Sequence, residues 1–447
     1  MNVEPTKKNI HLISLGCARN RVDAEVMLGS CLAQGWTYCD DASQADAIVV
    51  NTCGFIKEAK EESIDTILEA ATHKQENPGL QLVVAGCLSQ RYKGQLVKAL
   101  PEVDLFIGTD EFVKLPAMLA EKLPKGTVRA RRSNYLYQDY LPRINTLAKH
   151  SAYVKVAEGC QHNCAFCIIP AIRGPLRSRT IASVVAEVKT LVGQGVIEIN
   201  LIAQDLAAFG RDRSADELLP LLQALVLIAD LRWIRLLYIY PENISDEFLA
   251  FFAANEKIVK YLDIPMQHAS DRLLTLMNRG VTQKQLREII AKVRSSVPEV
   301  AIRTSVMTGF PSETPEDFTE LLNFVKDCAF AHLGCFIYSQ EEGTVAGRMQ
   351  EQVAEEVKGE RRDQVMALQQ GISRRYLESF VGKTVEVLAV GPVSNEHGVW
   401  QGRLATQAPE VDGLVFLTSA PASGSGSMVT VKIHQSLDYD LVGEPCL

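Results

Sequence analysis

The chain has 447 residues, of which 47% are hydrophobic and 22% are charged, and its formal net charge is −8. This negative balance excludes a protein that coats nucleic acid through charge alone, although a local basic patch could still hold RNA. No window approaches the run of about 18 apolar residues that a membrane span requires, and the N-terminal apolar run lacks a signal-peptide cleavage pattern. We therefore expect a cytoplasmic protein of roughly two to four domains.

The first part of the chain alternates short β-rich runs with segments of helical apolar spacing. Such alternation predicts a parallel, doubly wound α/β sheet. We assign this domain to residues 1–125 and the mixed segment 126–149 to a linker. The expected strands are residues 10–15, 46–51, 81–85 and 103–108, and the expected helices are Asp23–Gly35, Ile56–Thr72 and Gln90–Leu100.

Residues 150–345 repeat the alternation of strand and helix six times. Six β/α units without a clear seventh predict a partial (β/α)6 barrel, in which the chemistry belongs at the carboxyl ends of the strands. The expected strands are residues 153–158, 197–203, 233–240, 259–265, 301–307 and 332–339, with helices such as Ile181–Gln194 and Pro315–Cys328 between them.

The rest of the chain changes character twice. Residues 346–379 are charged and helix-prone, which predicts a connecting helix. Residues 380–447 carry short β runs separated by turn residues, and we expect a small antiparallel β-barrel there.

The eleven cysteines are many for a protein of a reducing compartment, where metal binding is a better explanation than disulfides. The segment EGCQHNCAFCIIP places Cys160, Cys164 and Cys167 in a C-x3-C-x2-C array just after the first barrel strand. Three thiolates on one loop can hold a four-iron cluster and leave one iron open. A closed zinc site with His162 as fourth ligand is the alternative, but the crowded spacing disfavours it.

Three further cysteines each follow an expected strand of the N-terminal sheet. Cys17 lies in SLGCARN, Cys53 in NTCGF and Cys87 in AGCLSQ. Because the carboxyl ends of parallel strands share one edge of a sheet, these three residues should converge in space. The trio therefore predicts a second three-cysteine cluster, although single cysteines are also common as buried core residues.

The central array, with Phe166 before its last cysteine, resembles that of the radical S-adenosylmethionine (SAM) superfamily. The resemblance implies that SAM binds the open iron and is cleaved to methionine and a 5′-deoxyadenosyl radical. It makes the ligands Cys160, Cys164 and Cys167 catalytic. The protein's own task would then be to position the radical and to exclude water and oxygen.

The motifs SLGCARNRVDAE, NTCGFI, EGCQHNCAFCIIP and RGPLRSR together resemble the methylthiotransferase family along nearly the whole chain. The family implies a transferase with two [4Fe-4S] clusters, the auxiliary one in the N-terminal domain, and a C-terminal TRAM domain. It also implies that SAM serves twice, as methyl donor and as radical source, and that an electron donor is needed.

Two branches of this family compete as the nearest resemblance. One modifies tRNA adenosine, whereas the RimO type modifies the β-carbon of an aspartate in the small-subunit ribosomal protein S-twelve. NTCG and PMQHAS, with His268 in the latter, are similar to the RimO type, while the tRNA branch typically has NTCS and PVQSGS. We expect the protein substrate, with no sequence-specific nucleic acid. A non-catalytic redox or cluster-carrier protein is a further alternative.

The charge of the last domain points the same way. Residues 380–447 contain three basic and seven acidic residues, for a net charge of −4. An acidic domain suits a basic ribosomal protein better than RNA, unless the charges only keep the domain soluble.

Several polar residues at barrel strand ends are candidates for cofactor binding. Strand-end position predicts that an amide or acid after the second strand holds the SAM amine or ribose, and that a glycine turn after the fifth approaches the adenosine. Arg173, Arg177 and Arg179 follow the cluster loop and could bind a carboxylate of SAM or of the target, with no choice among the three. The cofactor-binding candidates are Gln204, Asp205, Gln267, Thr308 and Gly309.

Overall fold

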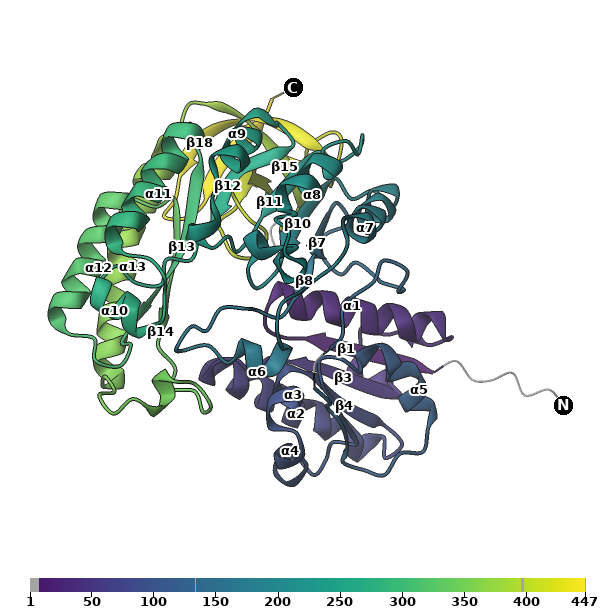
Figure 1. The fold of residues 1–447 in the computed structure, drawn as a ribbon. Coiled ribbons are helices and arrows are strands. Elements are labelled where there is room, and N and C mark those ends of the chain that lie inside the picture. Colours follow the sequence, from purple (N-terminus) through teal and green to yellow (C-terminus); the bar gives the residue numbers. More distant parts are fainter. Residues whose placement is uncertain (1–7, 133, 395–397, 447) are drawn as a thin grey trace.

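The N-terminal domain is a six-stranded parallel sheet with the strand order β2-β1-β3-β4-β5-β6 (Figure 1). The computed structural model describes residues 8–132, 134–394 and 398–446. All six residues of β3 are buried, as expected for a parallel strand covered on both faces. The strands are β1 Asn9–Ser14, β2 Thr37–Tyr38, β3 Ala47–Thr52, β4 Gln81–Gly86, β5 Leu105–Ile107 and β6 Thr127–Arg129.

Helices cover both faces of this sheet, which confirms the doubly wound prediction. Val49 and Val83 pack in one core with residues of α1 and α5. Ile48 and Val84 point the other way, into a second core with residues of α2 to α4. The helices are α1 Ala18–Ala33, α2 Lys57–Glu76, α3 Cys87–Tyr92, α4 Gly94–Ala99 and α5 Leu115–Ala120.

The structure differs from the expectation at three places in this domain. The segment expected as one helix over Gln90–Leu100 is two short helices, because Lys93 adopts a left-handed backbone with φ 47°. The two-residue strand β2 has no alternation that the sequence could reveal. Strand β6 pairs with β5, so the sheet extends to Arg129 and takes the first residues of the expected linker.

The central domain is the expected partial barrel. Its six strands are all parallel, in the order β14-β13-β12-β11-β10-β7, and the sheet stays open between β7 and β14. The strands are β7 Ser151–Lys155, β10 Glu198–Ile202, β11 Trp233–Leu236, β12 Ile258–Asp263, β13 Ala301–Thr308 and β14 His332–Ile337, with the short β8 Ala157–Glu158 and β9 Arg177–Ser178 paired beside them.

The helix boundaries of the barrel follow local sequence signals. α12 begins at Pro315 and ends at Cys328 as predicted, because Thr314 and Asp317 form a capping box and proline suits the first turn. The connecting helix packs against β14 and α12. The helices are α6 Ile169–Arg173, α7 Ile181–Gly193, α8 Leu218–Leu225, α9 Asp246–Ala254, α10 Asp271–Leu276, α11 Gln283–Ser296, α12 and the connecting helix α13 Glu355–Glu378.

The C-terminal domain is a closed five-stranded barrel in the order β15-β16-β17-β19-β18. The sequence predicted purely antiparallel pairing, but β17 and β19 are parallel neighbours and close the barrel. The strands are β15 Thr384–Pro392, β16 Trp400–Leu404, β17 Val415–Leu417, β18 Met428–Ser436 and β19 Leu441–Pro445.

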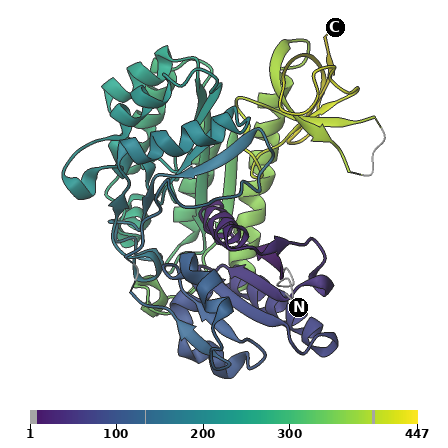
Figure 2. The same cartoon turned by 90° about the vertical axis from the view of Figure 1, so that its right-hand side faces the viewer.

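This small barrel docks on the amino ends of the central strands, away from the N-terminal sheet, although helix α1 reaches it through Arg21 and Val22 (Figure 2). Arg403 of β16 reaches the fully buried carboxylate of Glu198, at the start of β10, and donates to Ser151 Oγ across 3.1 Å. Arg235 donates to Glu198 across 3.0 Å and to the Ala405 carbonyl across 2.7 Å. Buried charges of both domains are thus compensated at their interface.

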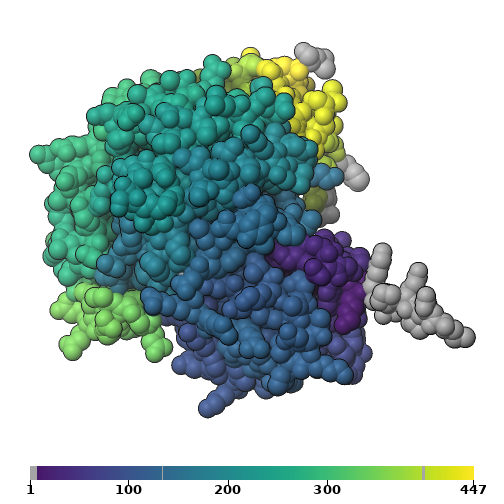
Figure 3. Space-filling model, turned by 45° about the vertical axis from the view of Figure 1, so that its right-hand side comes forward, coloured from purple at the N-terminus to yellow at the C-terminus, as the bar shows by residue number. Residues whose placement is uncertain are grey.

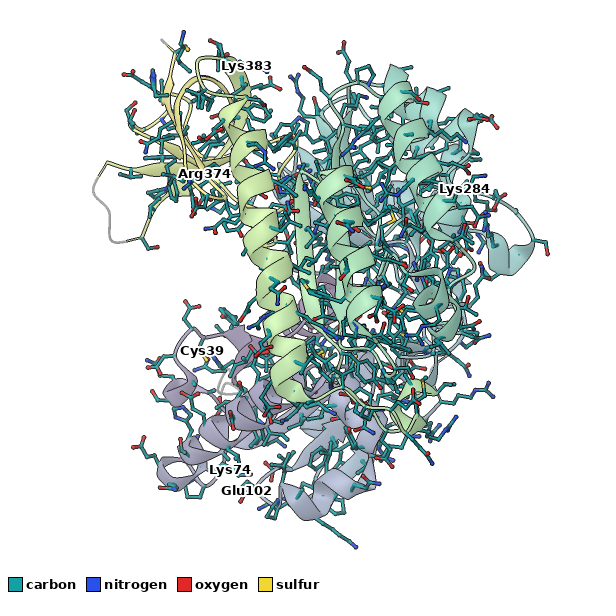
Figure 4. All side chains as sticks on the ribbon, turned by 90° about the vertical axis from the view of Figure 1, so that its left-hand side faces the viewer. Cys39, Lys74, Glu102, Lys284, Arg374 and Lys383 are labelled. Carbon is teal, nitrogen blue, oxygen red and sulfur yellow. The ribbon has the colours of Figure 1, made fainter. Side chains whose placement is uncertain are left out.

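Most acidic residues of the small barrel form ion pairs with the rest of the chain. Of its six described acidic residues, four pair with cations outside it, and the seventh, Glu396, lies outside the described residues. Arg374 lies on α13 beside this domain, where it pairs with Asp438 (Figure 4). Part of the net charge of −4 is therefore compensated by cations of the rest of the chain. The four pairs are Glu386–Arg232, Glu410–Arg21, Asp412 with Arg303 and His332, and Asp438–Arg374.

The N-terminal domain covers the other end of the barrel, at the carboxyl ends of its strands. Glu341, which follows β14, pairs with Lys60 of α2 at 2.7 Å and with Arg91 of α3 at 2.6 Å. In the space-filling view the segment after β14 lies directly against the surface of the N-terminal domain (Figure 3). In the described parts of the chain, no helix combines the length and apolar character needed to span a bilayer.

Candidate functional site: two cysteine triads at strand ends

The N-terminal cysteines lie at the edge of the sheet where the strand order reverses. Cys17 follows β1 and precedes α1, Cys53 follows β3, and Cys87 follows β4 as the first residue of α3. β1 and β3 flank the reversal, which is where ligands bind in open α/β sheets. The structure therefore brings together the three residues that the sequence places at strand ends.

Two glycines allow this close approach of backbone and sulfur. A Cβ on Gly16 would lie 2.9 Å from Cys53 Cβ, and Gly16 has φ +84°. A Cβ on Gly54 would lie 2.9 Å from the Cys87 backbone. Larger residues at either position would push the cysteines apart.

The three N-terminal thiols influence each other electrostatically. Burial, together with the proximity of Cys87 and Cys17, raises the pKa of Cys53 to about 12. Burial also raises the pKa of Cys87, and the Arg173 guanidinium opposes that rise. Cys17 is exposed, and the partial desolvation of its thiol, which would raise the pKa, is outweighed by Arg19 and backbone N–H groups, so the pKa lies below its ordinary value. Such a set favours a positively charged metal centre, which would stabilise all three thiolates together.

The second triad lies on the loop between β8 and α6, beside the carboxyl ends of the barrel strands. Burial raises the pKa of Cys160 to about 11 and that of Cys167 to about 12. The loop is fixed through Ala165, whose N–H donates to the Met277 carbonyl across 2.9 Å and whose carbonyl accepts from Ala346 across 2.8 Å. Three thiols on one rigid loop fit the donor set of an iron–sulfur cluster.

The geometry disfavours the zinc alternative. Among the described residues, no three Cys, His, Asp or Glu side chains converge closely enough to hold a single metal ion. His162, the proposed fourth zinc ligand, is bound elsewhere, because its Nε2 donates to Asp205 across 2.8 Å. A cluster of four irons and four sulfides is larger than one ion and fits thiols that are spaced more widely.

A stack of planar groups stands beside Cys164. The centres of the His162 and Tyr240 rings are 3.7 Å apart, and the two rings are nearly parallel, at an angle of 6°. The guanidinium carbon of Arg279 lies 3.9 Å from the centre of the Tyr240 ring. The Tyr240 hydroxyl is 2.8 Å from Cys164 Sγ and accepts a hydrogen bond from Arg279. This stack places a buried positive charge 3.7 Å from the Cys164 sulfur, where it would offset thiolate charge.

A small apolar cluster connects the two triads. Cys87 packs there with Ile168 and Ile172, which follow Cys167 directly on the cluster loop and α6, and Phe55 packs against them. Helices α3 and α6 are in contact. The two cysteine sets thus belong to one junction between the domains.

A buried ionic network ties the same junction together. Arg173 donates to Asn20 across 2.6 Å, to Asp23 across 2.7 Å and to Cys87 Sγ across 3.3 Å. Lys155 and Glu158 of the barrel complete the network around Asp23. Charges this deeply buried persist only when they are paired on all sides, so the network fixes α1 relative to the barrel.

The sequence did not distinguish among Arg173, Arg177 and Arg179 as carboxylate-binding residues, and the structure places them differently. Arg173 faces the N-terminal triad, as described above. Arg179 pairs with Glu187 and lies 4.7 Å from the Tyr137 ring centre, far inside the protein. Arg177 donates to the Tyr135 carbonyl across 3.0 Å. Arg173 alone among these three contacts a cysteine of either triad in the described residues.

Two cofactor candidates after β10 have different surroundings. Asp205 is buried, and its oxygens accept from His162, from the Ala207 N–H at 3.1 Å and from the Tyr240 N–H at 3.3 Å. These bonds give Asp205 a place in positioning the cluster loop. Gln204, in contrast, has a buried Oε1 with no hydrogen-bond partner among the described residues, so this acceptor is available to a ligand.

The remaining candidates lie at the same rim. Gln267 has φ 72° and its backbone bonds to β13 through Ser305 and Met307. The Gly309 N–H donates to Glu313, and a Cβ on Gly309 would lie 2.1 Å from the Lys358 side chain. Thr308 is buried and donates to the Lys358 carbonyl across 3.3 Å. The turn after β13 is therefore packed against α13, and contact with SAM at these residues stays a prediction.

Sequence reasoning missed Tyr240, Arg279, Arg19 and the role of Arg173. Tyr240 follows β11 and Arg19 follows Cys17, so the strand-end rule could have named both. Arg279 comes from a loop after α10, and only the folded chain brings it to Cys164.

Three family models match the chain in succession. The Uncharacterized protein family UPF0004 matches residues 9–108, the Radical SAM superfamily residues 154–325 and the TRAM domain residues 381–446. The ribosomal protein uS12 methylthiotransferase RimO of Citrifermentans bemidjiense is 45% identical over 444 residues, which are 99% of each chain. The protein of the same name from Anaeromyxobacter sp. is 46% identical over 435 residues, with 97% and 92% covered.

The chain belongs to the RimO family. Among solved structures, the radical SAM methyltransferase TsrM of Kitasatospora setae, with cobalamin and a [4Fe-4S] cluster bound, has a TM-score of 0.56 at 15% identity. That match covers 89% of this chain and 81% of TsrM. At this identity the likeness shows the fold alone, and it agrees with the parallel N-terminal sheet and open barrel of this RimO family member.

Proposed function

We infer that this chain is a radical SAM methylthiotransferase that acts on ribosomal protein uS12, replacing a hydrogen on the β-carbon of an aspartate by a methylthio group. Near-full-length identity of about 45% to curated RimO proteins supports the reaction and its substrate. The observation that carries the site is the pair of cysteine triads, connected by the cluster in which Cys87 packs with Ile168 and Ile172, just after Cys167. A reaction that needs both a radical source and a sulfur donor requires two such centres within reach of one carbon.

We assign one [4Fe-4S] cluster to each triad. Cys160, Cys164 and Cys167 would hold the cluster that binds SAM, and Cys17, Cys53 and Cys87 would hold the auxiliary cluster. When bound, these groups supply the radical that removes hydrogen from an unactivated carbon and the sulfur that is inserted there. Three protein thiolates per cluster leave one iron open in each. An external electron donor is part of the proposal, because the chain contains no residue type that supplies electrons at the required potential.

The chain's own residues position and protect these groups. Arg279 and Tyr240 lie against Cys164 and would hold its thiolate in place. Gln204 follows β10 at the barrel rim, and its unpaired Oε1 would accept a hydrogen bond from SAM. The ion pairs of Glu341 with Lys60 and Arg91 would hold the N-terminal domain against the barrel.

The function is tested in cells that lack the gene. Mass spectrometry of uS12 and of digested tRNA would be compared after complementation with the wild type, with a Cys160/Cys164/Cys167→Ala variant and with Cys446→Ala. Cys446 is exposed and remote from both triads, so its variant controls for loss of a cysteine. We expect the methylthio mark on uS12 with the wild type and the control only. A mark that appears on tRNA while uS12 stays unmodified would overturn the protein substrate.

A further inference from the structure

Arg19 spans the junction between the two triads. It stands in the first turn of α1, two residues after Cys17, and its Nη1 donates to the Ala203 carbonyl at the end of β10 across 2.7 Å. Its guanidinium carbon lies 4.8 Å from the ring centre of Tyr238, which follows β11. One side chain of the N-terminal domain thus reaches two strand ends of the barrel.

The contacts of Arg19 place it beside both triads. It is two residues from Cys17 in the first turn of α1. Ala203 and Tyr238, which it contacts, each lie two residues before a residue that contacts the loop of the other triad: Asp205 bonds His162, and Tyr240 bonds Cys164. Arg19 therefore lies between the two groups of cysteines.

Arg19 lacks the acidic partner that neighbouring arginines have. Arg173 is paired with Asp23 and Glu158, and Arg303 lies 4.0 Å from Asp412. In the described parts of the chain, no carboxylate lies within ion-pairing distance of Arg19, although its charge acts on the buried Asp263, and its hydrogen bonds go to the Ala203 carbonyl and the Tyr238 side chain. A guanidinium has five N–H donors, so most of its donor capacity is left for a ligand.

The Tyr238 ring supports the guanidinium from one side. This residue has φ 65°, a backbone conformation that is costly for a bulky side chain, and 39% of its surface is exposed. Strain of this kind persists where the surrounding structure needs the side chain in one place. Here it holds an aromatic face against Arg19, which fixes the plane of the guanidinium.

We propose that Arg19 binds the side-chain carboxylate of the target aspartate and so determines specificity for aspartate over asparagine. This proposal rests on the proposed function. The reacting β-carbon has to be within reach of both triads, and its carboxylate is one bond away. The planar fork of an arginine matches a carboxylate through two parallel hydrogen bonds. Arg19 stands on the helix that Cys17 precedes, on the side from which the sulfur would come, which favours the target over SAM as its ligand.

The test measures binding of two peptides to the anaerobic, cluster-loaded enzyme. One is the uS12 segment that carries the target aspartate, and the other has asparagine at that position. Binding is followed by fluorescence anisotropy for the wild type, Arg19→Gln, Arg19→Lys and Arg21→Gln. Arg21 lies on the same helix but pairs with Glu410 of the C-terminal barrel, so its variant matches the charge change elsewhere. Iron content and SAM affinity are measured on each variant.

We expect the wild type and Arg21→Gln to prefer the aspartate peptide by about 10- to 100-fold, the range for a charge-assisted hydrogen-bonded pair. Arg19→Gln should bind both peptides equally, and Arg19→Lys should keep part of the preference because it keeps the charge but loses the fork. An unchanged preference in Arg19→Gln overturns the proposal. So does a loss of SAM affinity with the peptide preference intact, which would assign Arg19 to SAM. A wild type that binds neither peptide would count against the proposed function itself.

Discussion

Arg173 donates a hydrogen bond to the Cys87 sulfur across 3.3 Å, so a side chain of the barrel touches a cysteine of the N-terminal domain. The same guanidinium binds Asp23 and Asn20 of α1. A single arginine therefore links the geometry of one proposed cluster to the loop that follows the other. The effect of this contact on the auxiliary cluster is open to measurement.

Replacing Arg173 by Met should lower the reduction potential of the auxiliary cluster, because hydrogen bonds to cluster sulfurs raise it. The change also leaves Asp23 and Glu158 short of a counterion, so we expect a loss of about 3–5 kcal/mol in unfolding free energy. Redox titration followed by electron paramagnetic resonance gives the potential, and denaturant unfolding gives the stability. Arg173→Lys should keep much of the unfolding free energy, but the reduction potential of its auxiliary cluster should stay below that of the wild type. An unchanged potential in Arg173→Met would show that the bond to Cys87 is lost when the cluster binds.

We expect Gln204 to contact SAM and Asp205 to position the cluster loop. Gln204→Ala should keep full iron content and weaken SAM binding by about tenfold, the worth of one hydrogen bond to a charged group. Asp205→Ala releases His162 and the Tyr240 backbone, so it should lower iron retention by the Cys160 triad. Iron analysis and SAM titration on both variants test this split. If Asp205→Ala weakens SAM binding and keeps its iron, Asp205 binds SAM and this assignment is wrong.

Arg403→Met should loosen the C-terminal barrel. It removes one of two arginines that compensate the buried Glu198 carboxylate, at a cost of about 3–5 kcal/mol. Limited proteolysis between α13 and β15 should become faster. Lys383→Met, an exposed position in the same domain, makes the same charge change and should have little effect. Equal proteolysis rates for the two variants would contradict the role of the Glu198 network.

The same network predicts a pH dependence. Burial alone would raise the pKa of Glu198, but Arg403 and Arg235 lower it from 4.5 to about 2. Because the folded pKa lies below the unfolded value, its contribution is fully present above about pH 4.5 and is lost as the pH falls towards 2, on the order of 3 kcal/mol in total. The stability difference between the wild type and Glu198→Gln should therefore shrink over that window. A difference that stays constant from pH 6 to about pH 2.5 would refute this linkage.

The sequence predicted most of what strand-end placement and local signals determine. The N-terminal triad could be found because each of its cysteines follows a parallel strand, and the second triad because its three cysteines are closely spaced on one loop. α12 was predicted to the residue because Thr314, Pro315 and Asp317 form a local start signal. Contacts between residues that are distant in the chain could not be predicted from the sequence. Arg173 meets Cys87 only after two domains dock, and Asp412 pairs with Arg303 and His332 across a domain boundary.

That last pairing also shows why the charge of the C-terminal domain is weak evidence for a protein substrate, although it favours the same substrate as the RimO relatives. A count of charges cannot tell a solvent-facing carboxylate from one that is buried against a neighbouring domain. Asp412 is almost fully buried, and burial is outweighed by His332 and Arg303, which keep its pKa below the ordinary value. Protein substrate preference therefore rests on the motifs and on the RimO relatives rather than on charge.

The most direct measurement is the iron and sulfide content of anaerobically prepared protein, for the wild type and for the two variants in which one whole triad is changed to Ala. We predict about eight irons in the wild type and about four in either variant, with matching sulfide. Loss of all iron on changing a single triad, a wild type with only one centre, or zinc in place of iron would contradict two separate clusters.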